Sequence, residues 1–304
     1  MDWDDLRHFL ALARQRSVRG AAGELGVSHS TVARRVEALE ARLGTRLFDR
    51  HRDGVVLTAA GERMLVAAER VEDEVCALTR DAAGHDRQLA GPLHLTCGDE
   101  YVAAQLLGDL RPWCEQHPEV ELAVTVDGRP FNLAKGEADL AVRALPSDAQ
   151  PPDAVIARQL APIHVANYVA RAHADRLDPT DPRTRWLAFD DRRFVERLVR
   201  SGSYPDLPLW GSFSTLRLMV HAVRAGLGVS LLPSYVGDAD PELVRLPRAD
   251  LRLAGRLWLL YHPDLRDNAR VRAARAVITE SFERRAGLFE GWSDPAPRRP
   301  VSGP

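Results

Sequence analysis

Two adjacent arginines follow closely on the predicted start of a helix in the segment VSHSTVARRVEALEARLGTRLFDR, residues 27–50. Arg34 and Arg35 come after a polar opening, Ser28-His29-Ser30-Thr31, in which Ser28 is a good N-cap. A guanidinium group binds phosphate oxygens or a guanine edge through paired hydrogen bonds, and a helix N-terminus attracts anions. The alternative is a solvated helix face. The residue types and their spacing favour a helix inserted into a polyanion.

An apolar stripe must position this helix. Four apolar residues recur at helical spacing and share one side: Val32, Val36, Leu39 and Leu43. The opposite side carries Ser30 and Arg34. A shorter helix over about 18–25 precedes Gly26, which permits a tight turn. Two helices joined in this way form a helix-turn-helix, whose second helix lies across a DNA major groove.

A hairpin follows the helices. Asp53-Gly54, between Arg50 and the alternating sequence VVLT, predicts the hairpin turn, and Arg50 and Arg52 flank its tip. Within residues 1–58, ten arginines face eight acids, whereas the whole chain has a net charge of −2 at pH 7. A nucleic-acid site must therefore be local rather than a basic coat.

One long helix is predicted over residues 59–88. It carries a seam at alternating spacings of four and three residues, made by Met64, Ala68, Val71, Val75, Leu78 and Ala82. The seam either packs on its own domain or pairs two chains. Because the preceding segment is too small to need thirty more residues of cover, we favour a dimerisation helix.

Strands alternate with helices after Gly91-Pro92, which predicts mostly parallel sheets with helices on both faces. The expected strands are 91–97, 120–127, 138–144, 164–170, 228–233 and 256–262, and the expected helices are 101–116, about 132–136, 212–225 and 269–286. The Pro-rich residues 287–304 are expected to form a disordered tail.

The N-terminal motif resembles that of the LysR-type transcriptional regulators. The matching residues are Ala21-Ala22, Leu25, Val27-Ser28, Val32, Arg34, Val36, Leu39-Glu40, Leu43-Gly44, Leu47-Phe48, Arg50, Leu57-Thr58 and Ala60-Gly61. GEADLAVR, AGLGVSLLP and LWLLYHPDLR also resemble the family's effector domain, so the likeness spans about residues 2–286. So many matches in one register make the signal specific.

The resemblance implies an N-terminal all-α winged helix-turn-helix and a C-terminal α/β effector domain of two subdomains, similar to type 2 periplasmic binding proteins. The expected boundaries are 1–58 for the DNA-binding domain, 59–88 for the linker and dimerisation helix, and 91–286 for the effector domain, with subdomain I at 91–160 and 263–286 and subdomain II at 161–262. A homodimer or homotetramer would bind imperfectly palindromic promoter sites on double-stranded DNA and respond to an unidentified small-molecule effector.

The expected DNA-binding residues cluster at the start of the third helix and on the wing: Ser28, His29, Ser30, Thr31, Arg34, Arg35, Arg50 and Arg52. Two positions depart from the family, which often has glutamine in place of His29 and serine in place of Ala33. Histidine either contacts a base edge or remains solvated.

Three stretches are expected to meet in the effector cleft, because ligands of α/β proteins collect at the carboxyl ends of strands. Their candidate residues are Cys97, Asp99, Glu100, Tyr101, Arg143, Phe213 and Ser214. Asp99 and Glu100 either disfavour an anionic ligand or only complement the dipole of their helix. Cys97 is either a redox sensor or, as we favour, a buried structural cysteine.

Other functional classes find little support. No catalytic motif is present, so we expect no enzyme, no catalytic residues, no cofactor and no metal site. A solute-binding protein would fit residues 92–286 but would leave the N-terminal third unexplained. The N-terminus is acidic first and apolar second, unlike a secretory signal, and no apolar run reaches membrane-spanning length. We therefore expect a cytoplasmic protein that does not bind a membrane.

Overall fold

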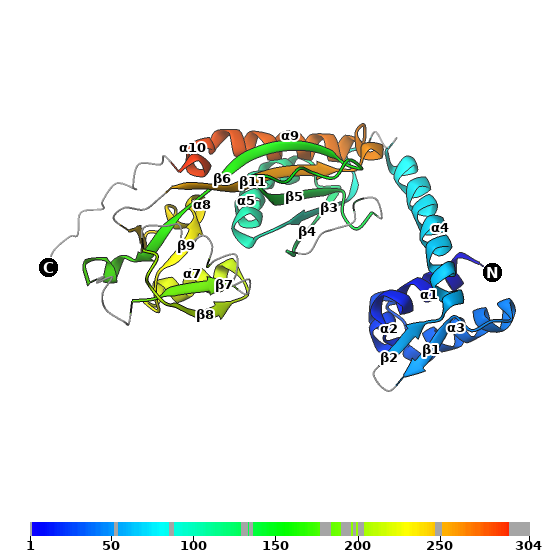
Figure 1. Cartoon of the computed structure of the whole chain (residues 1–304). Helices are drawn as coiled ribbons and strands as arrows, with labels where there is room; N and C mark the ends of the chain where they lie inside the picture. Colours follow the sequence, from blue (N-terminus) through cyan, green and yellow to red (C-terminus); the bar gives the residue numbers. More distant parts are fainter. Residues whose placement is uncertain are drawn as a thin grey trace. The chain divides into compact units, whose positions relative to one another are not determined.

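The computed structural model divides the chain into two compact units, residues 1–82 and residues 83–304 (Figure 1). The structure describes residues 2–51, 54–84, 88–128, 133, 136–176, 184–189, 196, 199, 204–246 and 251–291. The predicted helix at about 132–136 and the tail beyond Gly291 therefore lie largely or wholly outside the described residues.

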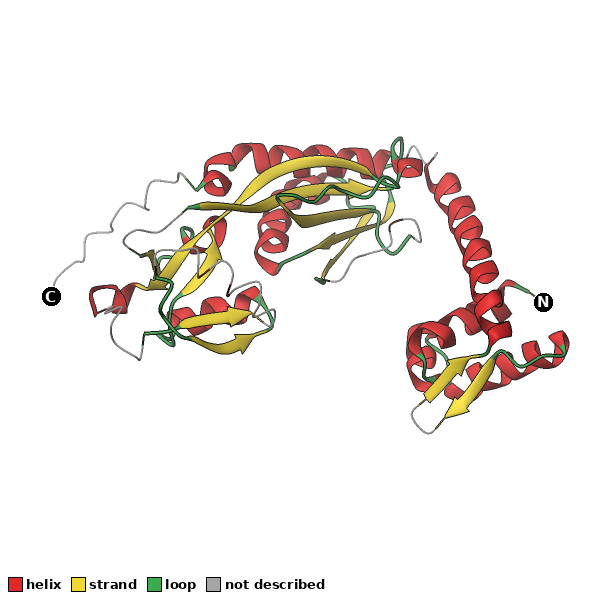
Figure 2. Cartoon of the chain, viewed as in Figure 1, coloured by secondary structure: helices red, strands yellow, loops and turns green. Residues whose placement is uncertain are grey.

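The N-terminal unit is a three-helix core with a two-stranded wing (Figure 2). Its elements are α1 (Trp3–Gln15), α2 (Val18–Leu25), α3 (His29–Leu43), β1 (Phe48–His51), β2 (Gly54–Leu57) and α4 (Ala59–Gly84). Ser28 caps α3 as predicted, and Gly26 ends α2 in the left-handed conformation at φ 65°. Val32, Val36 and Leu39 are buried against α1 and α2, whereas Leu43 is 44% exposed.

Two polar side chains fix the wing to the helices. Glu40 Oε1 accepts hydrogen bonds from the backbone N–H groups of Leu47, at 2.6 Å, and Phe48, at 3.0 Å. Thr58 Oγ1 donates to the Arg46 carbonyl at 2.8 Å and accepts from the Gly61 N–H at 3.0 Å. Because Arg46, Leu47 and Phe48 are all bound by these two side chains, the position of β1 relative to α3 is set.

The first half of helix α4 packs on its own unit. Ala68 is buried and Met64 is partly buried against the helical core, and Arg14 of α1 forms an ion pair with Glu72. On the same helix, Val71 is 42% and Leu78 is 71% exposed. Packing on its own unit is thus confirmed for the first part of the helix, and dimerisation stays a prediction.

The C-terminal unit is built around a seven-stranded sheet of order β10-β6-β11-β5-β3-β4, with β9 also paired to β6. The strands are β3 (Gly91–Cys97), β4 (Val120–Val126), β5 (Leu140–Pro146), β6 (Ile156–Ala170), β9 (Ser230–Pro233), β10 (Leu243–Arg245) and β11 (Arg252–Tyr261). A separate parallel pair contains β7 (Trp186–Phe189) and β8 (Leu209–Phe213).

The expectation of a mostly parallel sheet is wrong. β3 pairs in parallel with β4 and β5, but β6 and β11 pair antiparallel with every neighbour. The strand predicted over 164–170 begins at Ile156, so the predicted subdomain crossing near Leu160-Ala161 falls inside one continuous strand. Helical and strand periodicity predicts which segments are strands but not the direction of their partners.

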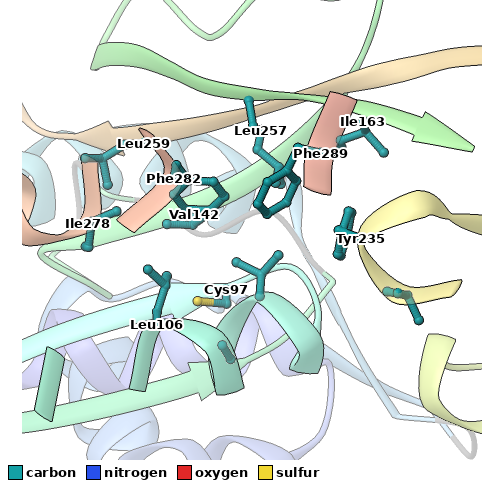
Figure 3. Packing of buried hydrophobic residues seen from close by; sticks show 14 of the residues in the cluster. Cys97, Leu106, Val142, Ile163, Tyr235, Leu257, Leu259, Ile278, Phe282 and Phe289 are labelled. Atoms are coloured by element: carbon teal, nitrogen blue, oxygen red, sulfur yellow. The ribbon is translucent and has the colours of Figure 1, made fainter. Parts of the chain in front are cut away.

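The sheet is covered by helices that share one apolar core (Figure 3). These helical elements are α5 (Glu100–Gln116), α7 (Leu216–Arg224), α8 (Ser234–Gly237), η3 (Pro263–Leu265), α9 (Ala269–Arg284) and α10 (Ala286–Glu290). The short helix η2 (Arg171–Arg176) packs through Ala174 on a second, smaller cluster. The rings of Phe282 and Phe289 lie 5.0 Å apart between centroids, and Tyr235 packs on Phe289 at 4.9 Å.

The predicted start of the disordered tail, at residue 287, is too early. Residues 287–290 belong to α10, where Phe289 is fully buried. Phe289 packs on Tyr235 of α8 and Phe282 of α9, and Ser234 donates a hydrogen bond to the Leu288 carbonyl, so these contacts fix the short helix. Within the described residues, no helix is long and apolar enough to cross a membrane.

Replacing Gly61 with alanine is expected to destabilise the N-terminal unit by about 1–3 kcal/mol, the usual cost of overpacking. A Cβ atom at Gly61 would lie 2.2 Å from the Leu47 carbonyl oxygen. Gly23→Ala inside α2 is the matched control, because a Cβ there meets nothing within 4 Å. Hydrogen exchange of the α1–α3 amides in the full chain measures the effect. Equal protection in both variants would contradict the close contact.

Candidate functional site

The first turn of α3 presents hydroxyl groups that are already ordered. Ser28 Oγ accepts from the Thr31 backbone N–H at 3.2 Å and lies 2.8 Å from the hydroxyl oxygens of both Ser30 and Thr31. Ser28, His29 and Ser30 are exposed. The helix therefore begins with polar groups available to phosphate or base edges.

Arg34 and Arg35 are adjacent but lie in different surroundings. Arg34 is exposed opposite the buried stripe and forms no ion pair or hydrogen bond with any part of the chain that the structure describes. Arg35 turns toward α1, where Nη1 lies 3.4 Å from Asp5 Oδ1 and Nη2 lies 3.3 Å from Asp4 Oδ2. The predicted DNA contact of Arg35 would have to compete with this internal ion pair.

Asp5 joins α1 to α3. Its side chain is fully buried, contacts Arg35 and lies 2.9 Å from Arg42 Nη1. Burial alone would raise the pKa of this carboxyl, but the Asp2 amide and the two guanidinium groups hold the pKa below its ordinary value. The sequence analysis did not single out Asp5.

The wing contributes Arg50. Its Nη2 forms an ion pair with Oε1 of Glu37 on α3, and the two side chains are 64% and 58% exposed. Between α3 and the wing lies a groove of about 330 Å³, whose lining includes Ala33, Glu37, Glu40 and Arg50. Arg52, the second predicted wing residue, lies outside the described residues.

The predicted effector residues in the C-terminal unit meet at the start of α5. Asp99 caps this helix, and its Oδ1 accepts from the Tyr101 N–H at 2.9 Å and the Val102 N–H at 2.8 Å. Its Oδ2 accepts from the Tyr235 hydroxyl at 3.0 Å. Burial raises the pKa of the Asp99 carboxyl, although these three donors oppose the shift. Burial, followed by the Asp99 charge, also raises the pKa of Tyr235.

A second carboxylate reaches the start of α7. Glu100 Oε1 accepts from the Arg217 backbone N–H at 2.9 Å, while Thr215 caps the same helix through the Leu218 N–H at 3.2 Å. The first turns of α5 and α7 are therefore in direct contact. We call the set of Asp99, Glu100, Arg217 and Tyr235 the junction.

The other predicted effector residues lie close to these helix starts. Arg143 of β5 donates through Nη2 to Thr96 Oγ1 at 2.6 Å, next to the end of β3 at Cys97. Phe213 is partly buried against the main core, Ser214 is exposed and Tyr101 is half-buried. Sequence analysis missed Tyr235 and Arg217, because one acts from a four-residue helix and the other through its backbone.

Comparison with known proteins places both units in one family. Residues 3–62 match the bacterial regulatory helix-turn-helix protein, lysR family, and residues 86–283 match the LysR substrate binding domain. The chain belongs to the LysR family. This LysR-type regulator is 30% identical over 257 residues to the HTH-type transcriptional regulator IlvY of Escherichia coli (strain K12), an alignment that covers 81% of this chain and 86% of IlvY.

Further relatives agree. The uncharacterized HTH-type transcriptional regulator YusT of Bacillus subtilis (strain 168) is 31% identical over 258 residues, which cover 82% of this chain and 86% of YusT. The full-length structure of the Vibrio cholerae virulence activator AphB, a member of the LTTR protein family, superposes with a TM-score of 0.60. That match is 19% identical and covers 92% of this chain and 99% of AphB, so it shows the fold.

The environment of Cys97 in this LysR-type regulator disfavours ionisation of its thiol. Cys97 is fully buried at the end of β3, and burial, followed by the Asp99 charge, raises the pKa of its thiol to about 12. Oxidation requires the thiolate, which is scarce at neutral pH for such a group. The structural interpretation of Cys97 is therefore favoured over the redox sensor.

Asp5→Asn is expected to destabilise the N-terminal unit of the regulator by about 1–3 kcal/mol at pH 7, the range for hydrogen bonds to charged groups. Because the folded-state pKa of Asp5 is depressed, its contribution is complete above about pH 4 and is lost as the pH falls through the folded pKa. Hydrogen exchange in α1 and α3 should therefore differ between wild type and variant at pH 7, and the difference should shrink as the pH falls through the folded-state pKa of Asp5.

The control for this comparison is Asp4→Asn, because Asp4 is 44% exposed and an exposed ion pair contributes less than about 1 kcal/mol. A pH-independent difference between wild type and Asp5→Asn would contradict the role assigned to the buried carboxylate.

Proposed function

We propose that α3 of this transcriptional regulator enters the major groove of double-stranded DNA and that Arg34 is its principal base-reading residue. Support comes from one contrast: Arg34 projects from the exposed face of α3, whereas Arg35 is engaged with Asp4 and Asp5. Ser28, His29, Ser30 and Thr31 supply contacts at the helix start, and Arg35 positions the helix.

The active form is proposed to be a homodimer, or a homotetramer built from dimers, that places two reading heads on an imperfectly palindromic promoter site. The exposed Val71 and Leu78 on α4 support this assembly, because they continue an apolar seam beyond the part that packs on its own unit. Two-fold symmetry then sets the half-sites about 34 Å apart or a multiple of that distance.

Arg34→Ala is expected to abolish sequence-specific binding, whereas Arg35→Ala should lower stability and leave base preference intact. A mobility-shift assay with selected genomic fragments at 50 and 200 mM salt measures both effects. Wild-type affinity should fall steeply with salt because phosphate contacts release counterions. Wild-type affinity in Arg34→Ala would refute its role. Equal binding to a half-site and a full site would contradict the two-headed complex.

We also propose that a small-molecule effector binds beside the junction, in reach of Arg143, Tyr101, Phe213 and Ser214. This proposal is supported by the contact between the first turns of α5 and α7, which brings the three predicted stretches together. An anionic effector would have to displace Glu100 from the Arg217 N–H. The junction therefore favours an uncharged or cationic ligand over a free anion.

A thermal-shift screen of the full chain against a metabolite panel tests this proposal. Stabilisation by a true effector is expected to weaken at least about tenfold in apparent affinity in Arg143→Ala or Glu100→Gln, which is about 1.4 kcal/mol. The effector should also slow hydrogen exchange in the first turns of α5 and α7. A compound that binds both variants like wild type would place the effector site elsewhere.

A further inference from the structure

Glu37 is one of the exposed side chains of α3. We propose that Glu37 determines base specificity: its carboxylate, held beside α3 by Arg50 of the wing, accepts a hydrogen bond from the exocyclic amino group of a cytosine in the major groove. The proposal rests on the entry of α3 into that groove.

The face of α3 that carries Glu37 also carries Arg34. With Val32, Val36 and Leu39 buried, the helical repeat turns Ser30, Arg34 and Glu37 to the opposite side, and all three are exposed. Glu37 follows Arg34 by three residues, so the two side chains are neighbours on one surface. Any surface that Arg34 reads therefore also faces Glu37.

The wing holds the carboxylate in place. Phe48 of β1 is buried, and Arg50, two residues later, projects from the same face of the strand to reach Glu37 across the groove. The start of β1 is itself fixed by Glu40, which accepts the Leu47 and Phe48 amides one turn along α3 from Glu37. Glu37 thus belongs to a short chain of contacts between helix and wing.

A carboxylate on a DNA-reading face selects among bases by what it rejects as well as by what it binds. Cytosine offers an amino donor in the major groove, whereas guanine O6 and N7 and thymine O4 are acceptors that would repel the carboxylate. The Arg50 charge offsets the repulsion between Glu37 and the phosphates. One oxygen of Glu37 is occupied by Arg50, which leaves the other for a base.

An ion pair that merely stabilises the fold is the simpler interpretation. Exposed pairs of this kind contribute little to stability, and Glu37 and Arg50 are each more than half exposed. The wing is already held by Glu40, Thr58 and the contact of Gly61 with Leu47, so it does not need the Glu37–Arg50 pair. The position of Glu37 is therefore better explained by contact with a partner.

Selection of bound duplexes from a random-sequence pool tests the proposal with full-length wild type, E37Q, E37A, E62Q and R34A. Wild type is expected to prefer a C·G pair by about tenfold at one position of each half-site. E37A should lose that preference while keeping the remaining positions. E37Q should favour A·T there, because a carboxamide both accepts from and donates to adenine. E62Q removes an exposed acid of α4 and should match wild type.

Each other outcome overturns the assignment. An unchanged motif in E37A and E37Q shows that Glu37 reads no base, and an equal change in E62Q attributes the effect to net charge. Loss of every position alike in E37A assigns Glu37 a structural role. The R34A arm separates the two proposals: a motif that is unchanged in R34A, E37A and E37Q alike refutes the α3 interface itself, whereas loss in R34A with no change in E37A refutes only the role of Glu37.

Discussion

Burial of Val32, Val36 and Leu39 fixes the rotation of α3 about its axis, and the functional side chains of the N-terminal unit take their places from it. With this stripe against α1 and α2, Arg34 faces outward and Arg35 faces the start of α1. These two arginines therefore lie in different environments, because adjacent residues of a helix point in different directions. The packing of a few apolar side chains decides which guanidinium group is exposed and which pairs with α1.

Carboxylates organise both units. Asp5 forms ion pairs with two arginines at the interface of α1 and α3. Glu40 accepts hydrogen bonds from the two backbone amides at the start of the wing. In the C-terminal unit, Asp99 caps α5 while Glu100 extends to the N-terminus of α7. Glu40, Asp99 and Glu100 accept hydrogen bonds from backbone N–H groups, and Asp5 pairs with guanidinium groups, so acidic residues position the elements of both units.

Local patterns predicted much of this structure. The second helix, the Ser28 cap and the strand over 91–97 follow from spacing and cap chemistry, because neighbouring residues determine them. The antiparallel pairing of β6 with β11 and the burial of Phe289 depend on partners far away in the sequence, which periodicity does not report. The candidate site divides in the same way: the start of α3 was predictable, whereas the engagement of Arg35 by Asp5 and of Asp99 by Tyr235 was not.

The long strand β6 has a mechanical consequence. Its first residues pair with β11 and its last residues pair with β9 and β10, so one backbone runs through both parts of the sheet. A ladder that is hydrogen-bonded along its length bends most readily where its register is interrupted, and the β6–β11 pairing is interrupted between Leu253 and Gly255 and between Leu257 and Trp258. An irregularity of this kind bends and twists its strand locally, so the curvature of the ladder is built into two short stretches in the middle of the sheet.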